Sequence, residues 1–97
     1  MLSNEQRKFL RGLAHDRKPV VLIGQHGLTE NVLAEITTAL DHHELIKIKL
    51  RGGNRQSRDE AMKKICAETQ AEPVQMIGNV LTLYKRNKEN PGIQLPK

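Results

Sequence analysis

The residues best suited to do chemistry form a short loop with glycine at each end, Gly24-Gln25-His26-Gly27. It follows an apolar strand expected over 20–23 and precedes an apolar helix that Thr29 is expected to cap. Glycine lets a ligand approach the backbone closely, and a helix start presents unpaired N–H groups with a partial positive charge. The loop therefore predicts a phosphate contact, to which His26 could donate. An ordinary tight turn with a solvent-facing histidine is the simpler alternative.

A second set of residues is basic and lies on a predicted strand over 45–51. Lys47, Lys49 and Arg51 alternate with aliphatic residues, so they share one face of that strand. A half-exposed strand needs polar residues on its outer face, but this need does not explain why all three of them are positively charged. Five cations and no acid occur from 47 to 58, and the last two are Arg55 and Arg58. We expect one basic surface here, with a candidate extension at Arg7, Arg11 and Lys18.

The overall charge agrees with a polyanionic partner. The 97-residue chain has a formal net charge of +5, which favours nucleic acid first and an anionic membrane surface second. The aromatic residues are Phe9 and Tyr84, too few for a platform that stacks several bases. Contacts are therefore expected to rest on phosphate, sugar and shape, while Tyr84 either stacks on one base or caps the sheet.

Other candidate sites are weaker. Adjacent helical residues point about 100° apart, so His42 and His43 in the 41–44 cluster are not expected to share a metal ion. Cys66 is predicted to be an inert thiol in the core. Because a single cysteine cannot form an internal disulfide, we expect a reducing compartment and a cytoplasmic protein. No apolar run is long enough to cross a bilayer, and no signal-peptide core is present. Because no nucleophile pairs with a base, neither enzymatic activity nor a cofactor is expected.

The pattern of elements predicts a single α/β domain over 1–97, with a core at about 3–86 and an irregular tail at 90–97. Capping boxes are expected to start the first helix at Ser3 and the third at Ser57. The strand over 20–23 is apolar on both sides, as in a central strand covered on both faces. Gly78-Asn79 predicts a hairpin. The order is helix-strand-helix-strand-helix-strand-strand, which gives a four-stranded mixed sheet whose first three strands are parallel.

Three segments carry a family resemblance: 24–36, 39–50 and 74–84. Together they resemble the CRM domain, the chloroplast RNA splicing and ribosome maturation module, in its stand-alone bacterial YhbY type. The resemblance implies a two-layer α/β fold similar to the C-terminal domain of translation initiation factor three. It also implies RNA binding without enzymatic activity, and a role with ribosomal RNA in large-subunit assembly.

The resemblance also implies where RNA binds. The family contacts RNA through its G-x-x-G loop and the basic residues beside it. Many members carry lysine after the first glycine, where this chain has Gln25. The basic strand and the Arg55 loop would therefore supply more of the positive charge.

The sequence thus predicts a monomeric RNA-binding protein that contacts ribosomal RNA during large-subunit maturation. A different reading is a ribosome-associated interaction protein that binds another assembly factor. No Lys or Arg occurs from 19 through 46, and that reading would use the acidic second helix, with Glu30, Glu35, Asp41 and Glu44. A DNA-coating domain is a third reading, disfavoured only by the resemblance.

Overall fold

The structure is a computed structural model that describes residues 2–24, 26–89 and 91–97. The observed elements follow the predicted order and confirm the α/β class. They are α1 (Asn4–Ala14), β1 (Pro19–Ile23), α2 (Glu30–His43), β2 (Leu45–Leu50), α3 (Arg55–Thr69), β3 (Glu72–Ile77) and β4 (Val80–Tyr84).

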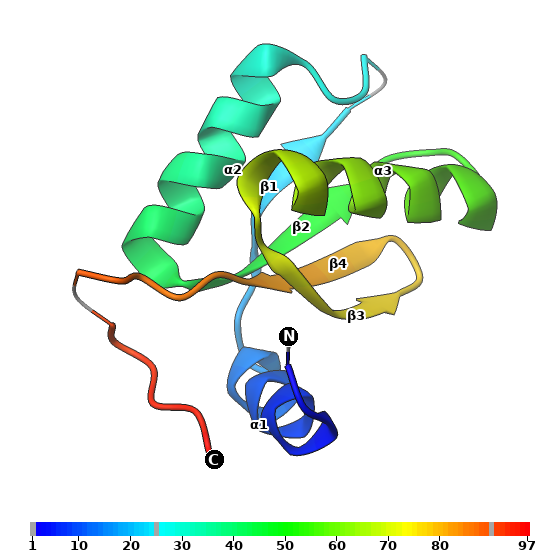
Figure 1. The fold of residues 1–97 in the computed structure, drawn as a ribbon. Helices are drawn as coiled ribbons and strands as arrows, with labels where there is room; N and C mark the ends of the chain where they lie inside the picture. Colours follow the sequence, from blue (N-terminus) through cyan, green and yellow to red (C-terminus); the bar gives the residue numbers. More distant parts are fainter. Residues whose placement is uncertain (1, 25, 90) are drawn as a thin grey trace.

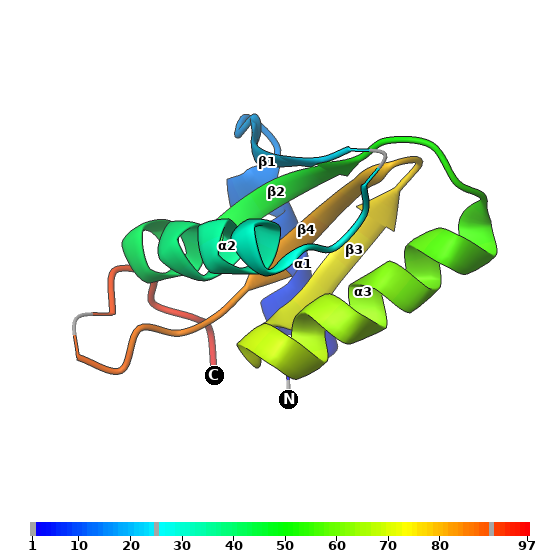
Figure 2. The ribbon, with the colours of Figure 1, turned by 90° about the horizontal axis from the view of Figure 1, so that it is seen from above.

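The strands form one mixed sheet in the order β1-β2-β4-β3. β1 pairs in parallel with β2, and β4 is antiparallel to both β2 and β3. The first three strands therefore run in one direction as expected, with β4 inserted between β2 and β3. Helices α2 and α3 cover one face of the sheet and α1 lies on the other (Figures 1 and 2).

The prediction that the first strand is central and covered on both faces is wrong. β1 is an edge strand, in which Val21 and Ile23 are buried whereas Val20 and Leu22 are 49% and 48% exposed. The inner position beside β2 is taken by β4, which returns through the hairpin. The face of β1 that points away from α2 is left largely uncovered, because α1 packs elsewhere.

The sheet separates two apolar clusters. The larger lies beneath α2 and α3 and includes Ile36, Ile48 and Ile65. The smaller lies beneath α1, where Leu10 and Ala14 pack with Leu45, Val74 and Tyr84. The apolar residues of α1 are thus only partly buried, because Phe9 and Leu13 remain 39% and 40% exposed.

Helix capping explains where the first and third helices begin. The Ser3 capping box is confirmed, since the Gln6 N–H donates to Ser3 Oγ and the Ser3 N–H to Gln6 Oε1. The predicted cap of α3 at Ser57 is wrong. Asn54 is the cap: the Ser57 N–H donates to Asn54 Oδ1 at 2.9 Å, and the Asn54 N–H donates to Ser57 Oγ at 2.9 Å. Asparagine is as good a cap as serine, so the helix begins earlier and takes in Arg55.

Glu44 ties the C-terminal segment to the domain. This residue follows α2 with φ 60° and is only 5% exposed, so its expected place on an exposed acidic face is wrong. Its carboxylate accepts hydrogen bonds from the backbone N–H groups of Asn87 (2.9 Å), Gly92 (2.5 Å) and Ile93 (3.0 Å). The described part of the tail has no regular secondary structure, yet Ile93 and Leu95 pack against the apolar cluster beneath α1.

Glu44→Ala is expected to lower the free energy of unfolding by about 2–4 kcal/mol, because three N–H groups lose a charged, largely buried acceptor. Glu44→Gln keeps one carbonyl oxygen and should cost about half as much. Urea denaturation measures both, with Glu35→Ala on the exposed side of α2 as the control, expected within about 0.5 kcal/mol of the parent. Equal effects of Glu44→Ala and Glu35→Ala would contradict this account of the tail.

Candidate nucleic-acid interface

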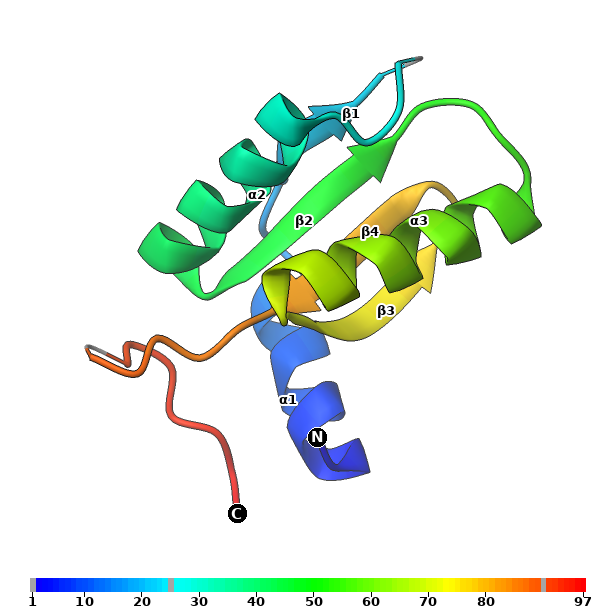
Figure 3. The same cartoon turned by 45° about the horizontal axis from the view of Figure 1, so that its top comes forward.

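The glycine loop and the basic connection after β2 both begin where their strands end. The sheet edge means this end of the sheet, where β1 and β2 finish, and not the side formed by the edge strand β1. Ile23 and Leu50 are paired across the parallel strands β1 and β2, and both strands end there. The Arg51 N–H donates to the Ile23 carbonyl at 2.9 Å, and the Leu50 N–H donates to the Asn79 carbonyl at 2.7 Å. The loop after β1, the connection before α3 and the β3–β4 turn therefore lie at one end of the sheet (Figure 3).

The loop itself is a tight turn. Gly27 has φ +73°, a conformation that favours glycine, and its N–H donates to the Gly24 carbonyl at 3.1 Å. A side chain at Gly24 would meet open space, which leaves room for a ligand against the backbone. His26 is exposed, and Gln25 lies outside the described residues.

The start of α2 supplies the remaining donors of the loop region. Thr29 is the predicted cap, and its Oγ1 accepts from the Val32 N–H at 3.1 Å. The N–H groups of Gly27 and Val32 already donate hydrogen bonds within the protein. The N–H groups of Glu30 and Asn31, in the first turn of α2, are the ones that point out of the helix. The Glu30 carboxylate sits at this same helix start, where it favours the helix but opposes an anionic ligand.

Two of the predicted lysines lie on the face of the sheet opposite α2. Ile46, Ile48 and Leu50 are buried beneath the helices, so the alternate residues of β2 point the other way. Lys47 is half-buried and Lys49 is exposed there. Lys49 pairs with Leu22 close to the glycine loop and to the exposed Arg51, whereas Lys47 pairs with Pro19 at the other end of β1. The two lysines and the glycine loop therefore do not form one continuous face.

Arg55 and Arg58 begin α3 on the other side of this edge. They line a hollow of about 260 Å³ with Asp59, Met76 and Gly78, close to the hairpin turn. The Arg58 guanidinium donates through Nη1 to the Gly53 carbonyl at 3.3 Å, and Asp59 brings a negative charge beside it. Arg55 is exposed, which leaves it the better placed of the two for an external anion.

The structure does not bring the candidate extension to the glycine loop. Arg7 and Arg11 belong to α1, and Lys18 precedes β1 at the opposite end of that strand from Ile23. Arg11 and Lys18 are exposed, whereas Arg7 is half-buried and its Nε has no acceptor among the described residues. A ligand at the loop would have to extend along the whole of β1 to come level with Lys18.

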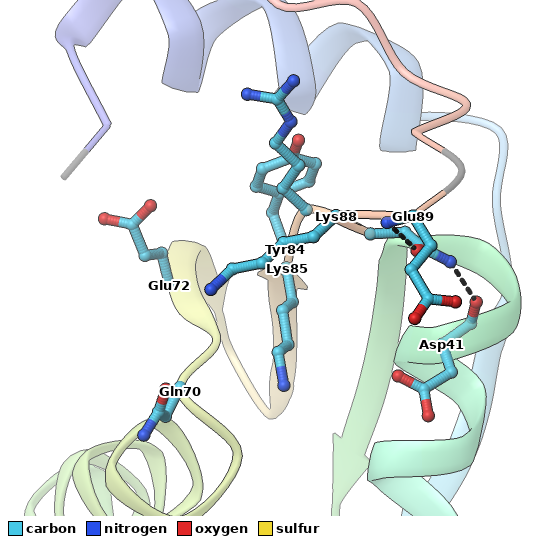
Figure 4. Close-up of a pocket in the computed structure, with 9 residues that line it drawn as sticks. Asp41, Gln70, Glu72, Tyr84, Lys85, Lys88 and Glu89 are labelled. Atoms are coloured by element: carbon cyan, nitrogen blue, oxygen red, sulfur yellow. Dashed lines mark hydrogen bonds between the residues drawn. The ribbon is translucent and has the colours of Figure 1, made fainter.

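Figure 4 shows the side chains that line a hollow of about 760 Å³. They come from the C-terminal ends of α2, α3 and β4 and the start of β3, away from the glycine loop. Within the hollow, the Asn87 side chain donates to the Asp41 carbonyl at 3.3 Å. Its wall carries three acidic and three basic side chains, so its charge does not favour a polyanion. The lining residues are Asp41, Gln70, Glu72, Tyr84, Lys85, Arg86, Asn87, Lys88 and Glu89.

Tyr84 caps the sheet. It is 3% exposed beneath α1, so base stacking would require the helix or the tail to move. Burial is the main reason that the pKa of its hydroxyl is raised, with the Glu44 carboxylate adding to the shift. The half-buried Cys66 behaves similarly, because burial and then Glu72 raise the pKa of its thiol and keep it protonated at neutral pH.

Two other classes of site find no support in the part of the chain that the structure describes. There, no three or more His, Cys, Asp or Glu side chains come together in a way that could hold a metal ion. The His42 and His43 rings are 6.3 Å apart at the end of α2. No described helix has both the length and the apolar character needed to cross a bilayer.

Sequence reasoning did not find the residues that orient the arginines. Asn54 and Ser57 place Arg55 in the first turn of α3, and Asn79 joins the hairpin to β2. The preference of asparagine for helix caps was the available signal at Asn54. No residue close to Asn79 in the sequence indicated that its carbonyl would accept a hydrogen bond from the Leu50 N–H.

Comparisons with known proteins agree on one family. The sequence profile described as the CRS1 / YhbY (CRM) domain matches residues 2–85. A protein of Haemophilus influenzae named "RNA-binding protein" is 52% identical over 96 residues, which cover 99% of this chain and 96% of that protein. "Probable RNA-binding protein YqeI" of Bacillus subtilis is 34% identical over 99% of this chain and 100% of its own length. The solution structure of the hypothetical protein SAV1595 from Staphylococcus aureus superposes with a TM-score of 0.85 and 36% identity, covering 99% of this chain and 100% of that one.

The two loop glycines are expected to differ in their effect on stability. Gly27→Ala should lower the free energy of unfolding by about 1 kcal/mol, because its φ of +73° is strained for any residue with a Cβ atom. Gly24→Ala should stay within about 0.5 kcal/mol of the parent, since it has neither a positive φ nor a close neighbour. Thermal and urea denaturation of both variants measure this, and a larger loss for Gly24→Ala would contradict the described turn.

Proposed function

This chain belongs to the CRS1 / YhbY (CRM) domain family, and we propose that it binds RNA through its glycine loop and the cations beside it. The observation that carries the proposal is the bond from the Arg51 N–H to the Ile23 carbonyl, which holds the backbone of a basic residue beside Gly24. The names of the relatives from Haemophilus influenzae and Bacillus subtilis support RNA as the ligand.

One phosphate would rest against the Gly24 backbone and the first-turn amides of α2. Open space at Gly24 permits close approach, and the partial positive charge of the helix start favours an anion. Arg51 would hold the next phosphate with its planar fork of donors, which suits phosphate better than a lysine does. Lys49 and Arg55 would extend this contact to either side of the sheet edge.

The RNA we propose is ribosomal RNA, contacted during maturation of the large subunit by a monomer in the cytoplasm. The proposed contacts at the sheet edge are made to phosphates, and the buried Tyr84 does not stack on a base. Such contacts suit a structured RNA that is recognised by its backbone and shape. Crosslinking in cells followed by sequencing of the attached RNA tests the target. Enrichment of large-subunit ribosomal RNA is expected, and its absence among the crosslinked fragments would refute this part of the proposal.

The reading as an interaction protein with an acidic second helix loses support. Glu44, one of its four acids, is buried and occupied by the tail. Glu30, Glu35 and Asp41 remain exposed on α2. Their exposure is what a solvated helix face requires. Asp41 also lines the 760 Å³ hollow, but the wall of that hollow carries both signs of charge and so singles out no partner.

Removing a single arginine at the sheet edge should weaken binding to ribosomal RNA fragments. Arg51→Ala and Arg55→Ala are each expected to lower the affinity about three- to tenfold, and to reduce the slope of log affinity against log salt by about 0.7–0.9. Lys88→Ala is the matched control, because it removes one exposed charge at the far end of the molecule. Fluorescence anisotropy over a series of salt concentrations measures all three.

A second variant tests the loop in the same assay. Gly24→Ala, which should not disturb folding, is expected to weaken RNA binding because its methyl group occupies the space a phosphate needs. A salt response that is flat for the parent protein would contradict the phosphate contacts. Equal loss in Lys88→Ala and Arg51→Ala would place binding elsewhere.

A further inference from the structure

One part of the sheet face opposite α2 and α3 is not covered by α1. Leu22 pairs with Lys49, Lys49 with Val80, and Val80 with Ile77, so these four residues form a row across all four strands. Directly paired residues point to the same face. Since Ile48 and its neighbours are buried under α2 and α3, the row points away from those helices.

The row is open to solvent and mostly apolar. Leu22 is 48% exposed and Ile77 is 65% exposed, while Val80 is half-buried. The residues under α1 include Leu45, at the start of β2, and the row crosses β2 four residues later. That separation is about 13 Å along the strand, which leaves the row beyond the part of the sheet that Leu45 shares with α1.

The charge in the two rows of this face that lie nearest the glycine loop has one sign, whereas Glu72 lies farther along the face, in the row of Leu45 and Tyr84. Lys49 stands in the row, and Lys47 is in the next row with Thr82 and Gln75. Neither of these rows contains an acidic residue along the paired positions of β2, β3 and β4. Arg51 follows Lys49 at the edge, so the apolar row is continuous with the basic edge beside the glycine loop.

We propose that this face holds the bases of an unpaired RNA segment whose backbone runs on to Arg51 and the loop. The inference rests on the proposed function and adds the class of RNA to it. Leu22, Val80 and Ile77 offer apolar area to the flat faces of the bases, while Lys47 and Lys49 neutralise phosphates. Sheets of four strands in other RNA-binding domains hold two or three bases in this manner with aromatic residues. Lys49 in this row and Lys47 in the next give these positions a positive charge with no acid among them, which favours a polyanion over a protein partner.

This site would distinguish single strands from duplexes. In an A-form duplex the base faces are stacked and unavailable, so only the phosphate contacts at the edge would remain. Substitutions in the row should therefore affect one kind of RNA, whereas substitutions of edge arginines should affect both.

The test uses Leu22→Ser and Ile77→Ser, with Leu13→Ser as the control. Leu13 is 40% exposed on α1, so the control removes a similar exposed apolar group outside the row. Binding to a single-stranded oligoribonucleotide and to a blunt RNA duplex is measured by fluorescence anisotropy. Each row variant should bind the single strand about three- to tenfold more weakly and the duplex within about twofold of the parent. The control should match the parent for both RNAs.

A measurement on the parent protein keeps the test independent of variant folding. A single-stranded RNA containing 4-thiouridine is crosslinked by light, and the attached peptides are identified by mass spectrometry. Crosslinks at 20–23 or 76–81 support the site, and crosslinks confined to other segments overturn it.

The remaining outcomes separate this inference from the proposed function. Unchanged single-strand binding in both row variants, with weakened binding of both RNAs by Arg51→Ala, overturns the inference alone. Failure of the parent to bind either RNA overturns the proposed function as well. A dimer of the parent in sedimentation that Ile77→Ser dissociates would assign the row to a second copy of the chain, and so would overturn the inference.

Discussion

The parallel pairing of β1 with β2 is the constraint on which the proposed site depends. The two strands end at paired residues, Ile23 and Leu50, and the bond from the Arg51 N–H to the Ile23 carbonyl continues the pairing past the strand end. A glycine loop and a basic segment that are distant in sequence thereby become neighbours. Without this register, Gly24 would precede an ordinary turn and Arg51 would be an isolated surface charge.

The helices then divide the sheet into parts with different roles. α2 and α3 bury the aliphatic side of β2, and this burial is what directs Lys47 and Lys49 to the other face. α1 closes that face over Leu45 and Tyr84, and Glu44 holds the tail against the same end. The opposite end keeps exposed cations and exposed apolar side chains such as Leu22 and Ile77.

Local sequence signals were sufficient for features that depend on neighbours in the chain. They gave the element order, the caps at Ser3 and Thr29, the alternation around Lys47 and Lys49, and the hairpin at Gly78-Asn79. They failed where distant segments decide the outcome. The edge position of β1 depends on where β4 inserts, and the burial of Glu44 depends on a tail more than forty residues later. The row from Leu22 to Ile77 draws on three separate segments, so no spacing in the sequence could show it.

The most direct test of the central claim maps the RNA contact on the whole protein in solution. Amide chemical shifts of the isotopically labelled chain would be followed while a ribosomal RNA fragment is titrated in. The account predicts that the largest changes fall at 22–31 and 49–58, the segments that meet at the edge of the sheet. Changes centred on the mixed-charge hollow at 84–89, or on the exposed acids of α2 at Glu35 and Asp41, would contradict it.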